Sequence, residues 1–186
     1  MAARVLLPSD ALHERVGELG RGISEACGDG VVLVGLLDGS VLFLADLVRN
    51  VRSRCAVDFL ALSTYGPEAG RARLVKDLDT DLAGRPVVVV SDVVDTGLTS
   101  TWLLGELDRR RPRSLDFCTL VDRQHHRLVP VPLRWVGVEV GEQFVVGYGL
   151  GYRGRYRNLD LLAVADLAEL RFDPDAHVAQ LYGTGG

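Results

Sequence analysis

Lysine is almost absent from this chain: Lys76 is the only one in 186 residues, and arginine carries nearly all of the positive charge. Cysteine is also scarce. Cys27, Cys55 and Cys118 are too scattered for a metal site, and any disulfide would leave one of them unpaired. No stretch approaches the roughly 18 apolar residues of a membrane span, and the chain opens without the apolar run of a signal peptide. These absences predict a cytoplasmic protein with free thiols in or near its core and no membrane partner.

Composition and charge narrow the class further. The chain is 47% hydrophobic and 25% charged and has no low-complexity segment. Its length suits a single α/β domain, residues 1–186, with a sizeable core. The net charge of −4 argues against broad nucleic-acid binding, so nucleic acid is not expected as a partner.

Apolar patterns predict strands that alternate with helices. Ser9 is expected to cap a first helix whose apolar residues recur at helical spacing through Ile23. A second helix should follow Gly39-Ser40, and a third should span Leu98–Arg109. The expected buried strands are 31–37, 56–64, 87–90 and 115–121. This order predicts an α/β fold with a parallel, twisted sheet flanked by helices.

The C-terminal part departs from this alternation. Residues 121–133 are expected to form a connecting segment after the strand 115–121. Residues 134–148 and 160–165 are expected to supply further strands. From about residue 135 to 186, together with the N-terminal segment, we expect a small hood over the site. Residues 65–73 carry glycine and arginine without apolar periodicity, which predicts a mobile loop able to act as a lid.

The segment from Asp92 to Thr99 carries the strongest chemical signal. It follows the expected strand 87–90 and opens a helix, so its backbone N–H groups should cradle a phosphate. Gly97 permits close approach of the anion, and the hydroxyls of Thr96 and Thr99 can donate to it. Asp92 can accept hydrogen bonds from ribose hydroxyls, directly or through bound Mg²⁺. The simpler alternative is an ordinary strand–helix junction with Asp95 as a helix cap.

This turn resembles the phosphoribosyl-diphosphate motif of type I phosphoribosyltransferases. Other stretches narrow the resemblance to the hypoxanthine-guanine branch and follow the same order over roughly residues 10 to 170. They are a pyrophosphate loop with its helix (34–47), a strand into a catalytic loop (57–66), the stretch after that loop (76–79), a purine-binding hood segment (144–150) and a tail (156–159).

The resemblance implies a fold, an activity and a set of roles. The expected enzyme transfers ribose 5-phosphate from 5-phosphoribosyl 1-diphosphate to a purine or purine-like base, with Mg²⁺ as cofactor and Asp92 as its ligand. Asp95 would be the general acid/base at purine N7. The other residues expected to bind phosphoribosyl diphosphate are Leu37, Asp38 and Gly39 (often with a cis peptide), Ser91, Asp92, the turn Asp95, Thr96, Gly97, Leu98 and Thr99, and Arg157.

The base-binding residues implied by the resemblance are Arg123, Phe144, Val145 and Gly151. Phe144 would stack on the base and the Val145 backbone would read its edge. The family also implies a homodimer or homotetramer.

Four positions depart from the family pattern, all in the expected site. Asp38 stands where lysine or arginine is usual beside the pyrophosphate. Ser91 replaces a glutamate that is paired with Asp92. Arg123 replaces a lysine that contacts the purine 6-oxo group, and is larger and bidentate. Gly151 replaces an aspartate that helps to bind a second magnesium and the base edge.

These departures leave three hypotheses. The first is an active phosphoribosyltransferase on a purine or purine-like base, including a modified base of specialised metabolism. The second is a catalytically weak, nucleotide-binding paralogue with a regulatory or scaffolding role. The third is an RNA-binding regulator on the same fold, for which the arginine run 109–113 is the best support; helix-dipole partners are the simpler explanation of that run.

Overall fold

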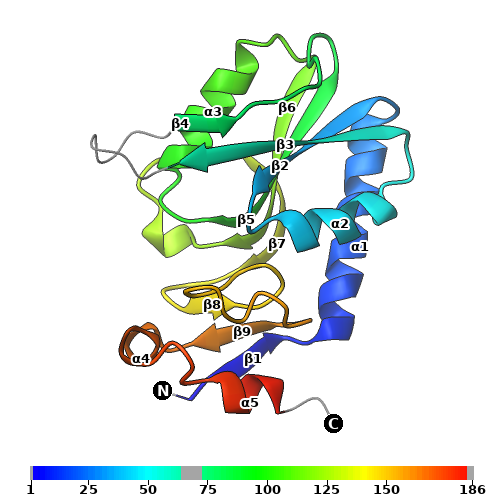
Figure 1. Ribbon diagram of the computed structural model, residues 1–186. Helices are drawn as coiled ribbons and strands as arrows, with labels where there is room; N and C mark the ends of the chain where they lie inside the picture. The colour runs from blue at the N-terminus through cyan, green and yellow to red at the C-terminus, as the bar shows by residue number, and fades with distance from the viewer. Residues whose placement is uncertain (1, 64–72, 184–186) are drawn as a thin grey trace.

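The chain folds around two sheets of different size (Figure 1). The computed structural model describes residues 2–63 and 73–183. The large sheet has the strand order β4-β3-β2-β5-β6-β7, and the small one has the order β1-β9-β8. The elements are β1 (Arg4–Leu7), α1 (Ser9–Cys27), β2 (Val31–Leu37), α2 (Val41–Asn50), β3 (Cys55–Ser63), β4 (Arg73–Lys76), β5 (Pro86–Val94), α3 (Leu98–Asp108), β6 (Ser114–Asp122), the 3-10 turn η1 (Gln124–His126), β7 (Leu133–Glu139), β8 (Phe144–Val146), β9 (Leu162–Ala165), α4 (Leu167–Phe172) and α5 (Val178–Tyr182).

The large sheet confirms the predicted parallel architecture. Strands β3, β2, β5, β6 and β7 run parallel, and β4 pairs antiparallel with β3 at one edge. The carboxyl ends of the parallel strands therefore meet along one edge of the sheet. In open α/β sheets this is the edge at which ligands bind.

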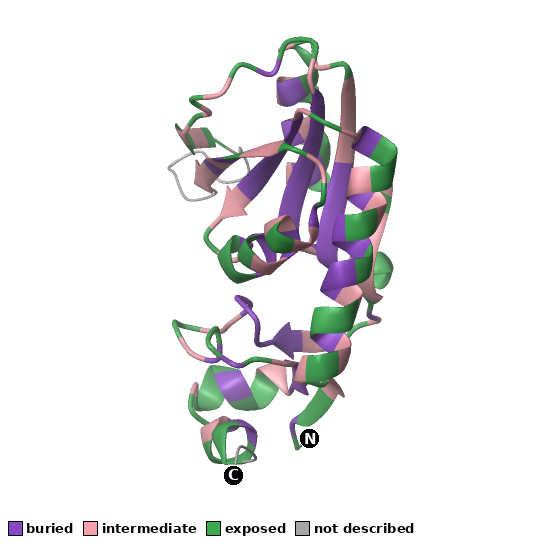
Figure 2. Ribbon diagram, turned by 90° about the vertical axis from the view of Figure 1, so that its right-hand side faces the viewer, coloured by how far each residue is buried: buried purple, intermediate pink, exposed green. Residues whose placement is uncertain are grey.

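The central strands are apolar because helices cover both faces of the sheet (Figure 2). Val88 and Val90 pack into one cluster with residues of α1 and α2. Val87 and Val89 point the other way, into a cluster with residues of α3. All four are fully buried. A strand buried on both sides needs a continuous valine run rather than an alternating pattern, which is why this strand could be predicted.

The smaller sheet, the loop 147–161 and helices α4 and α5 form a separate layer, called the hood below. Its β1 strand pairs antiparallel with β9, which also pairs antiparallel with β8. The N-terminal segment thus joins the hood, as predicted. The two ends of the chain both lie on this side of the molecule (Figure 1).

Two expectations about the hood and the first helix are wrong. The expected strands of 134–148 belong to two different sheets: Leu133–Glu139 joins the large sheet parallel to β6, whereas Phe144–Val146 joins the hood. The hood therefore starts near Phe144 rather than near residue 135, because the bend at 141–142 separates the two strands. Ser9 also does not cap α1. Pro8 occupies the N-cap position, and the Ser9 hydroxyl donates to Asp160 Oδ2 at 2.5 Å.

The hood is tied to the large sheet through Tyr148 and Gly149. The Tyr148 hydroxyl donates to Asp46 Oδ2 on α2, and its ring meets the His13 ring of α1 edge to face, with centroids 5.9 Å apart. Gly149 (φ 98°) lies so close to the Gly39 carbonyl that a side chain there would collide with it. The hood therefore lies directly over the loop that follows β2.

The cysteines and the single lysine can be placed in this fold. All three cysteines are free thiols, as predicted; Cys27 and Cys118 are buried. The Lys76 ammonium donates to the Phe59 carbonyl at 3.1 Å and lies 3.6 Å from Asp58 Oδ1. No helix within 2–63 and 73–183 is long and apolar enough to cross a membrane.

Candidate active site

The turn after β5 is built around Gly97. This residue takes a left-handed conformation (φ 84°) as the N-cap of α3, and a Cβ atom there would lie 2.5 Å from the Val129 carbonyl oxygen. Because glycine occupies the N-cap, no side chain caps α3, which leaves its first turn suited to an anion. The alternative of Asp95 as a helix cap is therefore wrong.

Hydrogen bonds from the segment after β6 fix the backbone of the turn at Asp95 and Thr96. The Thr96 carbonyl accepts hydrogen bonds from the amides of Leu128 and Val129, at 2.9 and 3.2 Å. The Arg127 Nε group donates to the Asp95 carbonyl at 3.1 Å, and the same guanidinium pairs with the buried Asp122 carboxylate. These contacts fix the backbone from which the Asp95 side chain projects.

Asp92 lies within β5 rather than in the turn, because the strand continues to Val94. Its Oδ1 accepts hydrogen bonds from the Val93 amide at 2.9 Å and from the Ser91 hydroxyl at 3.3 Å. Burial raises the pKa of Asp92, and the positive charge of Arg157 opposes that rise. The Asp92 carboxylate also reaches the Gly39 backbone so closely that any side chain at position 39 would collide with it.

Ser91 points away from the predicted site. It is 2% exposed, and its hydroxyl donates to the Val93 carbonyl at 3.1 Å as well as to Asp92. It is not among the residues that line the cavity described below. Successive residues of a strand face opposite sides, so Asp92 and Ser91 do not both reach the same ligand. In this structure Ser91 contacts the Asp92 carboxylate and the Val93 carbonyl.

The loop after β2 has the expected backbone. The Leu37–Asp38 peptide bond is cis. The Asp38 side chain is exposed, and its carbonyl accepts from the Val41 amide at 3.3 Å. The Ser40 hydroxyl donates to the Leu36 carbonyl at 2.6 Å. The loop thus presents backbone groups and Gly39 to the edge of the sheet.

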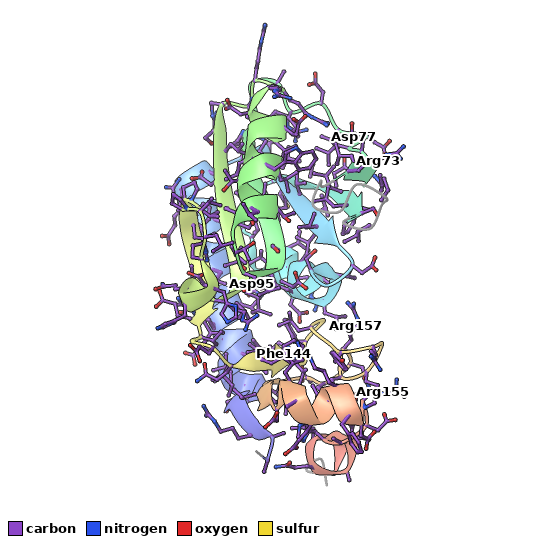
Figure 3. The ribbon with its side chains drawn as sticks, turned by 90° about the vertical axis from the view of Figure 1, so that its left-hand side faces the viewer. Arg73, Asp77, Asp95, Phe144, Arg155 and Arg157 are labelled. Carbon is purple, nitrogen blue, oxygen red and sulfur yellow. The ribbon has the colours of Figure 1, made fainter. Side chains whose placement is uncertain are left out.

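A cavity of about 290 Å³ lies between the edge of the large sheet and the hood. It brings together most of the predicted charged and base-binding residues, although they come from four separate stretches of sequence. Figure 3 shows Asp95 at the end of the large sheet, with Phe144 and Arg157 across from it on the hood. The lining residues are Asp92, Val93, Asp95, Val121, Arg123, Phe144, Val145, Gly149, Leu150, Gly151 and Arg157.

The hood side of the cavity combines an aromatic ring with a close-packed loop. Phe144 meets the Tyr152 ring edge to face, with centroids 6.0 Å apart. Arg157 donates from Nη1 to the Gly149 carbonyl at 3.0 Å. Gly151 lies against Arg157, since a Cβ atom there would lie 2.8 Å from Arg157 Cγ and would also collide with the Arg155 carbonyl. A side chain at 151 would thus displace Arg157.

Sequence reasoning missed His126, which lies beside Asp95. Its Nδ1 is 3.4 Å from Asp95 Oδ1, and its Nε2 is 3.1 Å from Arg123 Nη2. Arg123 Nη1 is also 3.4 Å from Asp95 Oδ1. The available signal was position: His126 follows β6 by a few residues, at the ligand-binding edge of the sheet. The predicted catalytic-loop residues 64–66 and the predicted lid 65–73, apart from Arg73, lie outside the described part of the chain.

Comparison with known proteins agrees with this arrangement. Residues 7–153 match the phosphoribosyl transferase domain family, a span that includes the large sheet, the turn after β5 and most of the cavity. The fold is that of a phosphoribosyltransferase.

Individual relatives narrow the family further. Hypoxanthine phosphoribosyltransferase of Haemophilus influenzae is 41% identical over 172 residues, covering 89% of this chain and 96% of the relative. Hypoxanthine-guanine phosphoribosyltransferase of Mycobacterium avium is also 41% identical, covering 87% and 85%. A crystal structure of the hypoxanthine-guanine enzyme of Bacillus anthracis superposes with a TM-score of 0.83 at 35% identity, covering 88% of this chain and 98% of that one. The chain belongs to the hypoxanthine phosphoribosyltransferase family.

Proposed function

We propose that the cavity between the large sheet and the hood binds 5-phosphoribosyl 1-diphosphate and a purine or purine-like base, and that Asp95 handles the proton of that base. Family membership makes the chain an enzyme that transfers a phosphoribosyl group to a purine base. The observation that carries the residue assignment is the cavity itself, which joins Asp92, Asp95, Arg123, Phe144 and Arg157.

In the proposed reaction the C1–oxygen bond of the ribose breaks and pyrophosphate leaves with the electron pair. A ring nitrogen of the base forms the new bond to C1, and the proton of N7 passes to the Asp95 carboxylate. The transition state has oxocarbenium character, so positioning and charge stabilisation carry most of the catalysis. The cavity walls around Asp95 and Phe144 would exclude water from C1.

The phosphoribosyl group would be held mainly by backbone. The first turn of α3, with Thr96, Gly97, Leu98 and Thr99, suits the 5-phosphate because its N-cap is a glycine without a competing side chain. Asp92 would bind the ribose hydroxyls. The Leu37–Gly39 backbone and Arg157 would contact the pyrophosphate, and the carboxylate of the exposed Asp38 would take no part.

The residues present fit a magnesium ion that is bound largely through the substrate. Mg²⁺ is held in such sites by one or two carboxylates plus substrate phosphates. Asp92 supplies one carboxylate, which lies directly against the Gly39 backbone of the loop expected to hold the pyrophosphate. Within the described residues no group of three metal-ligating side chains exists, so diphosphate and ribose oxygens would supply the other ligands. When bound, the ion would neutralise the leaving pyrophosphate.

The base would lie between Phe144 and the sheet edge. Phe144 would stack on it, the Val145 backbone would read its edge, and Arg123 would donate to an exocyclic oxygen. The side-chain carboxylate usual at position 151 is absent, so the Gly151 region would contribute backbone only. Arginine in place of lysine and glycine in place of aspartate both favour a base that differs at this edge from hypoxanthine or guanine.

The other two hypotheses have less support. RNA binding has little support, since three arginines of the run 109–113 are engaged within the protein: Arg109 pairs with Glu106, Arg110 with Asp77 at 2.7 Å, and Arg113 donates to the Cys27 carbonyl at 3.3 Å. The weak paralogue remains the direct competitor. A homodimer or homotetramer and a cytoplasmic location stay predictions; analytical ultracentrifugation would test the first.

One assay separates the enzyme from the weak paralogue. Purified protein is mixed with Mg²⁺, 5-phosphoribosyl 1-diphosphate and hypoxanthine, guanine, xanthine or a deazapurine, and pyrophosphate release is measured together with nucleotide formation. We expect release that depends on both the base and Mg²⁺. Nucleotide binding without release, for every base and with a normally folded protein, would overturn the proposal and support the paralogue.

A further inference from the structure

We infer that His126 is a positioning residue that couples Arg123, which lines the base end of the cavity, to the Asp95 carboxylate. The inference rests on the proposed role of Asp95 as proton acceptor. His126 would thus act on the cavity through two charged neighbours, a role that sequence reasoning did not anticipate.

The hydrogen-bond chemistry of arginine fixes the state of the histidine ring. Arg123 Nη2 lies 3.1 Å from His126 Nε2, and a guanidinium can only donate. His126 Nε2 must therefore accept, which requires the neutral ring with its proton on Nδ1. That Nδ1–H group lies 3.4 Å from Asp95 Oδ1. One ring thus accepts from Arg123 and presents its only donor to Asp95.

The Asp95 atom on this side needs such a donor. Asp95 Oδ1 is buried and has no hydrogen-bond partner, although Arg123 Nη1 and His126 Nδ1 both lie 3.4 Å away. Arg123 thus attracts the carboxylate by its charge and the neutral His126 ring presents its N–H group, but neither forms an aligned hydrogen bond. Contacts of this kind in a ligand-free site commonly tighten when substrate binds. His126 therefore holds Asp95 Oδ1 from behind, which leaves Oδ2 for the base.

The same contact orients Arg123. Its Nη2 group is shared between His126 Nε2 and the Glu142 carbonyl, the latter at 3.4 Å. Its Nε is buried without a partner, and the side chain lines the cavity. With Nη2 held by these two acceptors, Nη1 lies 3.4 Å from Asp95 Oδ1. His126 thus sets the direction of the two charged groups that meet the base.

Two substitutions, each keeping one of the two ring contacts, separate the contact with Asp95 from the contact with Arg123. His126→Asn keeps an N–H group near the position of Nδ1 and loses the acceptor for Arg123. His126→Gln keeps an acceptor near the position of Nε2 and loses the donor to Asp95. His126→Ala loses both. His125 is a matched control, because it lies in the same turn but is exposed.

Steady-state kinetics of these variants test the inference. Relative to wild type, we expect kcat to fall about 10- to 100-fold in His126→Ala and His126→Gln and to recover in His126→Asn, since a misplacement near 1 Å costs about that much. The KM for the base should rise in His126→Ala and His126→Asn and recover in His126→Gln. His125→Ala should match wild type. Equal losses in all three His126 variants, or none, would overturn the inference.

A second measurement does not depend on turnover and so separates this inference from the proposed function. Long-range ¹H–¹⁵N spectra of the ring nitrogens resolve the four histidines of the chain. We expect His126 in the Nδ1–H form, with a shift of its Nδ1 resonance in Asp95→Asn and of its Nε2 resonance in Arg123→Ala. An Nε2–H form, or resonances that ignore both substitutions, would sink the inference even in an active enzyme. An inactive wild type with the expected spectra would count against the function alone.

Discussion

The two walls of the cavity are built by different means. The wall on the large sheet comes from the ends of β5 and β6, which are buried strands, and it carries Asp92, Asp95 and Arg123. The wall on the hood comes from a loop with left-handed backbone at Gly147, Tyr148 and neighbouring residues, and it carries one ring and one guanidinium. The sheet wall places its charged side chains at the ends of deeply buried strands, whereas the backbone geometry of a loop shapes the hood wall. Substitutions on the two walls should therefore fail in different ways.

The largest effect should come from the sheet wall, at Asp95. In Asp95→Asn the shape is kept but the proton acceptor is lost, so we expect kcat to fall by about 10²- to 10⁴-fold. Binding of 5-phosphoribosyl 1-diphosphate, measured by calorimetry, should change little, because the α3 backbone holds the 5-phosphate. A kcat within a few-fold of wild type would remove Asp95 from the proton transfer.

A loop wall should be sensitive to added volume. Gly151→Ala would displace Arg157, which it contacts, so it should raise the KM for 5-phosphoribosyl 1-diphosphate much as Arg157→Ala does, by about 10- to 100-fold for a lost charged hydrogen bond. The matched control is Gly105→Ala on the exposed face of α3, where nothing lies within 4 Å. A normal KM in Gly151→Ala would show that the loop yields and that Arg157 is not held by it.

A smaller effect is expected from the ring on the hood. Phe144→Ala should raise the KM for the base about tenfold, since stacking of a base on an aromatic ring contributes about 1–3 kcal/mol. Phe144→Leu keeps the apolar volume without the ring and separates stacking from simple filling of space. Unchanged base KM values in both variants would mean that Phe144 packs in the hood without touching the base.

The smallest effect concerns the link between the walls. Tyr148→Phe removes the hydroxyl that bonds to Asp46, and we expect the free energy of unfolding in urea to fall by about 1 kcal/mol at pH 8. Activity should persist, because Tyr148 does not line the cavity. An unchanged unfolding free energy would show that other contacts hold the hood.

Tyr148 also predicts how the free energy of unfolding should change with pH. Burial raises the pKa of Tyr148 to about 12, whereas an unfolded tyrosine titrates near about 10. The folded state therefore favours the protonated phenol. Its contribution is complete below about pH 10 and is lost as the pH rises through about 12. Between these values wild type should lose stability more steeply than Tyr148→Phe; equal slopes would contradict the assignment.

The parts of the fold that could be predicted are those in which one physical requirement dominates. The valine strand at 87–90 had to be buried on both faces, and Gly97 had to permit a tight turn. Leu133–Glu139 could not be assigned to the large sheet, because it is an edge strand with a mixed, half-buried pattern that suits either sheet. The hood loop escaped prediction because positive φ values leave no periodic signal.

The site residues, too, could be predicted where one physical requirement dominates. Asp92, Asp95 and Arg123 could be placed together because the ends of parallel strands converge, whereas Arg157, in the hood loop, was placed only by the family resemblance. Ser91 stays a prediction from the resemblance, although the strand was expected to end at Val90 and in fact runs past it. Once β5 reaches Val94, alternation alone puts its hydroxyl on the far side from the cavity. His126 was missed because only the folded turn brings it to Asp95.

The near-absence of lysine has a practical consequence for inhibitors. Lys76 is anchored at the β3–β4 edge, and the cationic side chains of the cavity are Arg123 and Arg157. Aldehyde warheads that form Schiff bases with lysine would therefore find no partner in the cavity. Dicarbonyl reagents selective for guanidinium groups would meet one target on each wall. A covalent ligand for this enzyme is best designed as an arginine-directed crosslinker that closes the hood onto the sheet.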